Sequence, residues 1–204
     1  MPERLGVFGG TFDPIHVGHL VTAVNVRHSL SLDRVLLVVA HDPWQKAGTV
    51  ATPAADRLAM VQAAVVDVPG LEASAIELER RGHSYTADTL TDLQRLHPDA
   101  QLFLILGSDA AAGLPTWERV DEVRALATLV VVTRPGAEEL TAPAGWSYER
   151  LEVPRLEVSS TDLRARFADG RPLDYLVTGP VQRLIRERGL YALGTAAPDE
   201  GARP

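Results

Sequence analysis

The sequence predicts an α/β fold in which one domain contains a doubly wound, mainly parallel sheet followed by C-terminal helices. Three observations predict this fold class. Short apolar runs rich in β-branched residues alternate along the chain with segments whose apolar residues recur at helical spacing. Most of the short runs are nearly all apolar, as expected for parallel strands buried on both faces. The length of 204 residues is sufficient for one well-buried domain of this kind.

The expected strands and helices follow one another in a regular order. Apolar runs predict strands at residues 4–9, 34–40, 71–79, 101–107 and 128–133. Helical spacing predicts helices at residues 17–30, 55–67, 86–97, 116–126, 159–170 and 180–190. The helix at 159–170 opens with hydroxyl residues suited to an N-cap. This strand–helix–strand succession indicates a Rossmann-like, doubly wound domain.

Composition limits the setting and the partners. We expect one domain over residues 1–193, and a disordered tail over 194–204, where the sequence is small, polar and contains proline. The net charge of −7 argues against a broad nucleic-acid or membrane surface but permits a small anionic substrate held by local positive groups. The chain has no cysteine, which excludes disulfides and thiolate chemistry. It contains no long apolar run and no signal-peptide pattern, so we expect a cytoplasmic protein. The sequence leaves open whether the chain forms a homo-oligomer.

A glycine-rich turn with two histidines lies between the first predicted strand and the first predicted helix. Residues 6–19 read GVFGGTFDPIHVGH. Gly9 and Gly10 let backbone amides approach an anion, and the following helix directs its positive end to the same place. His16 and His19 are three residues apart, so they share one face of the first helical turn. In a doubly wound sheet this is the edge where ligands bind, and the segment therefore predicts a phosphate site.

The segment matches neither of the two most familiar phosphate-binding patterns. It has no G-x-x-x-x-G-K-[ST] loop and no G-x-G-x-x-G fingerprint, which disfavours kinase-like and dehydrogenase-like functions. Taken alone, a pair of histidines in H-x-x-H spacing is equally compatible with a plain glycine turn and a helix whose histidines are buried or solvated.

Two motifs at opposite ends of the chain carry a family resemblance. GGTFDPIHVGH, together with VSSTDLR near the C-terminus, resembles the nucleotidyltransferase superfamily with an H-x-G-H motif and a Ser-Ser-Thr-x-x-Arg motif. Within it, HSYTADTL, LILGSDAAAGLPTW and VVTRPG look like bacterial nicotinate-mononucleotide adenylyltransferase. The similarity runs from about Leu5 to about Tyr191. The main departure is EVSST, where the family more often has isoleucine before the serines, and it affects no functional side chain.

The resemblance implies adenylyl transfer from ATP to the phosphate of nicotinate mononucleotide, giving nicotinate adenine dinucleotide and pyrophosphate. A phosphate monoester is already a nucleophile, so the enzyme positions the reactants and neutralises charge. His16 and His19 are then donors to the reacting ATP phosphates. Arg164 is the group that binds the departing pyrophosphate. Mg²⁺ is implied as well, held mainly by ATP phosphates and water, with no protein metal ligand.

The remaining ATP-binding residues are expected at strand ends and at the second motif. Asp109 follows the strand at 101–107, so its carboxylate would reach ribose hydroxyls; a turn or N-cap aspartate is the alternative. Arg134, which follows the fifth predicted strand, is expected to line the ATP side. The full expected set is Gly9, Gly10, Thr11, Gly107, Asp109, Arg134, Ser159, Ser160 and Thr161.

Four residues are expected to bind nicotinate mononucleotide. Lys46 could reach a substrate phosphate, although it could equally be a solvated loop residue. Tyr85 and Thr86 stand where a helix begins, and the amides there would favour a carboxylate. Trp117 could stack on the pyridinium ring or simply fill the core.

Two other functions remain open at this stage. The first is a superfamily relative with another acceptor, such as phosphopantetheine, or with a cytidylyl-transfer substrate. The second is a nucleotide-binding module without turnover. The segments SYTADTL and PTW favour the pyridine-nucleotide branch over the first. Intact His16, His19 and Arg164 disfavour the second.

Overall fold

A six-stranded parallel sheet forms the centre of the protein. The computed structural model describes residues 1–42, 52–133, 145–146 and 148–192. The strands are β1 (Arg4–Gly10), β2 (Arg34–Val39), β3 (Leu71–Ser74), β4 (Gln101–Gly107), β5 (Ala127–Thr133) and β6 (Tyr148–Glu152). Their order is β3-β2-β1-β4-β5-β6, and each neighbouring pair is parallel. The order reverses between β1 and β4, which is where doubly wound sheets bind nucleotides.

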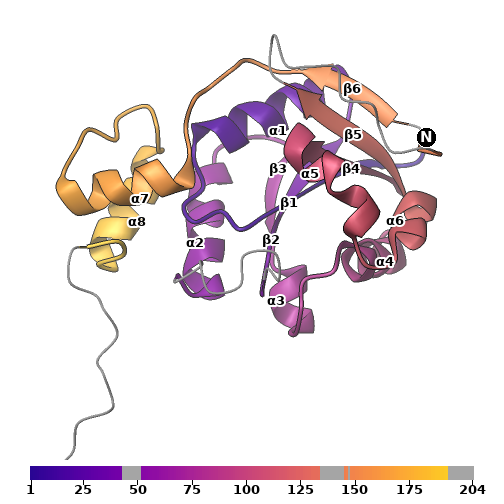
Figure 1. Ribbon diagram of the computed structural model, residues 1–204, viewed down its shortest axis with the longest axis horizontal. Coiled ribbons are helices and arrows are strands. Elements are labelled where there is room, and N and C mark those ends of the chain that lie inside the picture. The colour runs from indigo at the N-terminus through magenta and orange to yellow at the C-terminus, as the bar shows by residue number, and fades with distance from the viewer. Residues whose placement is uncertain (43–51, 134–144, 147, 193–204) are drawn as a thin grey trace, which may run out of the picture.

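Helices cover both faces of this sheet (Figure 1). They are α1 (Val17–Ser29), α2 (Ala54–Val65), α3 (Ile76–Arg80), α4 (Thr86–Leu96), α5 (Ser108–Ala112), α6 (Val120–Leu126), α7 (Ser160–Asp169) and α8 (Gly179–Glu187), with a short 3₁₀ helix at Leu114–Thr116. Residues of α1, α2, α7 and α8 share one core cluster, and residues of α4, α5 and α6 share the other. The Rossmann-like α/β fold predicted from the sequence, including the C-terminal helices, is confirmed.

The sequence of β2 explains why both faces are covered. Val35 and Leu37 point into the cluster of α1 and α2, whereas Leu36 and Val38 point into the cluster of α4 and α5. Successive side chains of a strand alternate between faces, so an all-apolar strand requires a helix layer on each side. All four side chains are buried.

Three expectations about the elements were wrong in detail. The segment 71–79 was expected to be one strand, but β3 ends at Ser74 and α3 begins at Ile76. The helix expected at 116–126 begins at Val120, because a 3₁₀ turn and an extended residue, Trp117, come first. Strand β6 was not predicted, since it is a half-exposed edge strand with charged residues. An edge strand has only one paired neighbour and little apolar signal.

One negative finding concerns membranes. Within residues 1–42, 52–133, 145–146 and 148–192, no helix combines the length and apolar character needed to cross a bilayer. The tail expected at 194–204 lies outside the described residues.

Candidate active site

Two adjoining cavities lie at the carboxyl ends of the strands. The larger, of about 990 Å³, contains the H-x-G-H turn and the start of α7; we call it the large cavity. The smaller, of about 290 Å³, lies between the start of α4 and the segment after β4; we call it the small cavity. Both include Gly9, Gly10, Thr11 and Ala110 in their walls. The end of β1 therefore faces both cavities at once, at the point where the strand order reverses.

The glycines at the end of β1 keep its backbone accessible. A side chain at Gly10 would meet the Phe12 ring at 2.7 Å, and that ring is buried in the core, so only glycine fits. At Gly9 the space is open, so its backbone faces the cavity without an obstructing side chain. Phe12 itself has a left-handed backbone, with φ of 52°, which turns the chain sharply out of the strand. Gly9, Gly10 and Thr11 thus line both cavities.

His16 and His19 form one stacked unit at the start of α1. His16 is the N-cap residue, and its backbone N–H donates to Nδ1 of His19 at 3.2 Å. The ring centroids are 3.7 Å apart and the planes differ by 26°. A side chain at Gly18 would meet Nδ1 of His16 at 3.0 Å, so glycine at this position leaves room for the imidazole. The prediction that the two histidines share one face is confirmed, and both line the large cavity.

The surroundings of the two histidines determine the charge of His16 and the tautomer that a neutral His19 adopts. Burial lowers the pKa of His16 from 6.5 to about 4, because the charged ring would lose its hydration, so the ring is neutral near pH 7. Nδ1 of His19 accepts a hydrogen bond, so a neutral His19 ring carries its proton on Nε2. Nδ1 of His16 is buried and has no hydrogen-bond partner among the described residues. A neutral imidazole still offers one N–H donor to an anion.

The second motif lies beside the H-x-G-H turn and also lines the large cavity. Ser159 caps α7 by accepting a hydrogen bond from the Asp162 amide, which confirms the predicted N-cap. Ser160 donates its hydroxyl to the carbonyl of Pro14 at 2.9 Å. Arg164 donates from Nη1 to the carbonyl of Asp13 at 2.7 Å. These two bonds hold the start of α7 against the H-x-G-H turn, although about 150 residues separate them in the sequence.

Gly107 and Asp109 line the large cavity at the end of β4. Gly107 ends β4, and Asp109 lies in the first turn of α5. Both line the large cavity together with Thr161, as expected for residues at the carboxyl edge of the sheet. Asp109 is exposed, so its carboxylate is accessible to a ligand.

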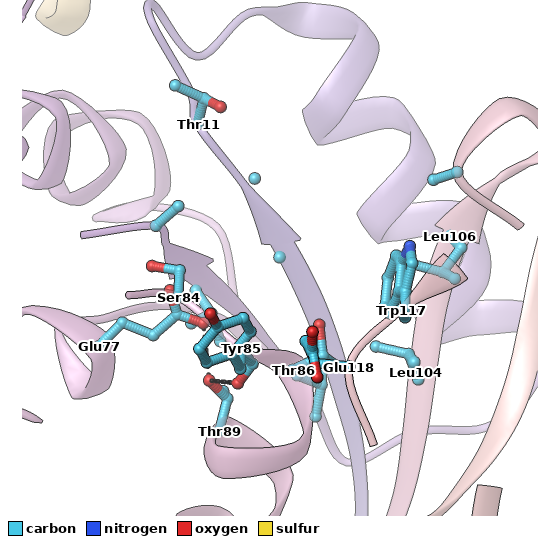
Figure 2. Close-up of a pocket in the computed structure, with 16 residues that line it drawn as sticks. Thr11, Glu77, Ser84, Tyr85, Thr86, Thr89, Leu104, Leu106, Trp117 and Glu118 are labelled. Atoms are coloured by element: carbon cyan, nitrogen blue, oxygen red, sulfur yellow. Dashed lines mark hydrogen bonds between the residues drawn. The ribbon is translucent and has the colours of Figure 1, made fainter. Parts of the chain in front are cut away.

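The small cavity is lined by three of the four residues expected to bind the mononucleotide, Tyr85, Thr86 and Trp117. In Figure 2, Trp117 lies on one side of the cavity beside Leu104 and Leu106, and Tyr85 lies on the other. Helix α4 begins at Thr86, directly after Tyr85, as the sequence predicted. Trp117 is half-buried and lines the cavity, although part of it packs against the core.

Lys46 and Arg134 lie outside the described residues. The structure therefore does not place either side chain, and their expected roles stay predictions.

Sequence reasoning missed a buried arginine beneath the site. The Arg57 side chain, 1% exposed, donates hydrogen bonds to the carbonyls of Thr11, Ala40, His41 and Thr52. These carbonyls come from the turn after β1, the two residues that follow β2, and the segment that leads into α2. One guanidinium thus fixes three segments at the edge of the sheet. In the sequence, Arg57 is an ordinary polar residue within a helical pattern, so no local signal marks it.

Two polar residues of the small cavity were also missed. Ser84 accepts hydrogen bonds from the His41 and Asp42 amides at 2.9 and 3.3 Å, which joins the end of β2 to the start of α4. Glu77 is 8% exposed, and its Oε1 accepts from the Thr89 hydroxyl at 2.7 Å. Figure 2 shows Glu77, Ser84 and Thr89 on the same side of the cavity as Tyr85.

Comparison with known proteins assigns the family. The model of the cytidylyltransferase-like family matches residues 7–166. A probable nicotinate-nucleotide adenylyltransferase of Corynebacterium kroppenstedtii is 47% identical over 191 residues, covering 92% of this chain and 90% of the relative. Another from Streptomyces coelicolor is 47% identical, covering 90% of this chain and 98% of the relative. The chain belongs to the nicotinate-nucleotide adenylyltransferase family.

Solved structures agree with this family at the level of the fold. The nicotinic acid mononucleotide adenylyltransferase of Plasmodium falciparum, solved with NaAD, superposes with a TM-score of 0.75. It is 16% identical, and the match covers 93% of this chain and 97% of that chain. The family resemblance inferred from the H-x-G-H and Ser-Ser-Thr-x-x-Arg motifs of this chain is therefore confirmed.

Proposed function

We propose that this enzyme transfers the adenylyl group of ATP to nicotinate mononucleotide, giving nicotinate adenine dinucleotide and pyrophosphate in NAD biosynthesis. The observation that carries the proposal is that His16, His19 and Arg164 line one cavity, which the glycines of β1 join to a second cavity. An adenylyl donor and a mononucleotide acceptor need two neighbouring sites that bring the reacting phosphates of the two substrates together. The end of β1 provides that meeting point.

The large cavity binds ATP in this proposal. Gly9, Gly10 and Thr11 present backbone groups to the phosphates, and the first amides of α1 add a positive dipole end. The N–H groups of His16 and His19 stabilise the charge that develops on the transferred phosphate. Because His16 is neutral, its contribution is a hydrogen bond without a formal charge. Arg164 supplies the formal charge for the departing pyrophosphate.

The remaining residues of the large cavity bind the nucleoside and the phosphate chain. Asp109 accepts hydrogen bonds from ribose hydroxyls at the edge of β4, beside Gly107. Ser159, Ser160 and Thr161 place the start of α7, with its unpaired helix amides, towards the phosphates. Arg134 is proposed to line the same side.

The small cavity binds nicotinate mononucleotide. The first amides of α4 have no carbonyl partner within the helix, so together with the Thr86 hydroxyl they suit the nicotinate carboxylate. Asp88 in the same turn is paired with Arg119 at 2.6 Å, which reduces its repulsion of a bound anion. Trp117 stacks on the positively charged pyridine ring. Tyr85 and Lys46 complete the proposed set.

A divalent cation, Mg²⁺, would accompany ATP. Among the described residues, no group of three or more histidine, aspartate or glutamate side chains could hold a metal ion. We propose that mainly phosphate oxygens and water hold this cation. When bound, the cation neutralises phosphate charge; the chain's own residues orient the two substrates. We also propose a cytoplasmic location, because ATP is the donor; a homo-oligomer and the absence of nucleic-acid partners stay predictions.

The test is pyrophosphate release from ATP with a panel of acceptors. Nicotinate mononucleotide should give the fastest release, and omitting the acceptor should abolish it. Faster release with phosphopantetheine, or with CTP as the donor, would assign the chain to another branch of the superfamily. ATP binding without release for any acceptor would leave only a nucleotide-binding module.

A further inference from the structure

The C-terminal end of the described chain reaches back to the H-x-G-H turn. The hydroxyl of Tyr191 donates a hydrogen bond to Oδ1 of Asp13 at 2.5 Å, across 178 positions of sequence. Its ring lies 5.8 Å from that of Phe167 in α7, and its hydroxyl lies 3.8 Å from Sδ of Met60. The ring therefore packs against Phe167 and the core cluster, separately from the contacts that its hydroxyl makes.

The carboxylate of Asp13 is buried beside the arginine of the second motif. Asp13 is 2% exposed, and its Oδ2 has no hydrogen-bond partner among the described residues. Nη1 of Arg164 donates to the Asp13 carbonyl at 2.7 Å and lies 4.0 Å from Oδ2. This separation is an ion contact but exceeds hydrogen-bond distance. A small rotation of the Asp13 carboxylate would bring Oδ2 within hydrogen-bond distance of Nη1 of Arg164.

The other nearby cation is not equivalent. Arg57 also interacts electrostatically with Asp13, but its guanidinium donates to four backbone carbonyls. Arg164 donates to one carbonyl and, at 3.4 Å, to the Thr161 hydroxyl. Of these two arginines, Arg164 alone lines the large cavity. A competition between Asp13 and a bound anion would therefore involve Arg164.

We propose that Tyr191 is a positioning residue for Arg164: its hydroxyl holds the Asp13 carboxylate back, so that the guanidinium stays directed to the pyrophosphate part of ATP. The inference rests on the proposed function, in which Arg164 binds pyrophosphate. Without the hydroxyl, Asp13 loses its hydrogen bond in a water-poor site, and a buried carboxylate then takes the nearest cation. A guanidinium paired with Asp13 cannot bind the ligand, so the apparent Kd equals the intrinsic Kd divided by the fraction of molecules whose Arg164 is still free of Asp13.

The experiment is a calorimetric titration of pyrophosphate, with Mg²⁺ in the buffer, into the wild-type chain and its variants. Tyr191→Phe keeps the ring packing and removes only the hydroxyl, so pyrophosphate should bind roughly five- to tenfold more weakly. Asp13→Asn keeps an acceptor for Tyr191 but removes the competing charge, so affinity should be unchanged or higher. In the Asp13→Asn background, Tyr191→Phe should then change the affinity less than about twofold. Tyr175→Phe is the matched control, since Tyr175 is fully exposed in the α7–α8 connection.

Three results would overturn the proposal. They are wild-type affinity in Tyr191→Phe, weaker binding in Asp13→Asn, and equal weakening by Tyr191→Phe with and without Asp13. If Tyr191→Phe unfolds, Asp13→Asn decides alone, because a purely structural carboxylate would lose affinity when neutralised. A wild-type chain that binds pyrophosphate but releases none from ATP and nicotinate mononucleotide would refute the proposed function. The pyrophosphate titrations of the variants would still test the role of Tyr191.

Discussion

The backbone N–H of His16 donates to Nδ1 of His19, and the two imidazole rings stack with their centroids 3.7 Å apart. The residues that cap α1, His16 and His19, are therefore the same residues that line the candidate site. The hydrogen bond that closes the first turn of α1 also selects the tautomer of His19, which places its proton on Nε2. Stacking then fixes the direction in which both rings face the large cavity.

Replacing either histidine should affect the rate more than ATP binding. If each N–H stabilises the transition state, His16→Ala or His19→Ala should lower kcat by about 10²–10³, as for the loss of one oxyanion donor. The affinity for ATP, measured by titration, should change much less. His28→Ala is the control, because His28 lies exposed at the other end of α1. Turnover within about threefold of wild type in both single variants would contradict the assigned roles.

The lowered pKa of His16 predicts a pH dependence of stability. In the folded chain the pKa is about 4, whereas the unfolded residue has the ordinary value of 6.5. Between these pH values the unfolded state binds more protons than the folded state, so the free energy of unfolding increases with pH. The chain therefore becomes less stable as the pH falls from 6.5 to 4. The loss from this one residue should be on the order of 2–3 kcal/mol. Urea unfolding at several pH values measures it.

The control for this prediction is His16→Asn, which cannot titrate in the same range. Its stability should fall less than that of wild type between pH 7 and pH 4. Parallel curves for the two proteins would show that His16 is not the responsible group.

The parts of the site that could be predicted are those whose functional residues lie close together in the sequence. Gly9, Gly10, His16 and His19 lie within residues 9–19, and the spacing of the two histidines placed them on one face of the first helical turn. The cap at Ser159 was predictable for the same reason. The residues behind the site carry no such signal. Arg57 reaches carbonyls from three segments that meet only in the folded chain, and the same holds for the partner of Tyr191.

The boundaries that failed have a related cause. The segment 71–79 alternates well enough for a strand, but the pairing of β3 with β2 ends at Ser74, and the following residues turn over the small cavity as α3. Pairing partners, not local preference, set the end of that strand. Strand β6 likewise forms only because β5 offers an edge.

Arg57 should be required for stability as well as for activity. Lysine preserves the charge but cannot reach four carbonyls from three segments, so Arg57→Lys leaves buried acceptors unpaired. We expect a loss of about 3 kcal/mol in the free energy of unfolding, measured by urea titration. The matched control is Arg95→Lys, whose side chain is 73% exposed and should lose less than about 0.5 kcal/mol. Equal losses in the two variants would mean that the four hydrogen bonds contribute little.

The small cavity should distinguish the acid from the amide form of the substrate. Nicotinate and nicotinamide mononucleotides differ by a carboxylate against a neutral amide, and the start of α4 offers donors but a reduced negative charge, since Asp88 is paired with Arg119. A site built for a charged group rejects its neutral analogue, so kcat/KM for nicotinate mononucleotide should exceed that for the amide by at least about tenfold. Trp117→Ala should mainly raise KM for the mononucleotide, because the indole lines only the small cavity, and KM for ATP should stay nearly unchanged. Trp117→Phe retains an aromatic face and should recover part of the affinity, which separates stacking from a loss of core packing. Equal use of the two mononucleotides by the wild-type enzyme would refute the carboxylate site at α4 even if adenylyl transfer itself were observed.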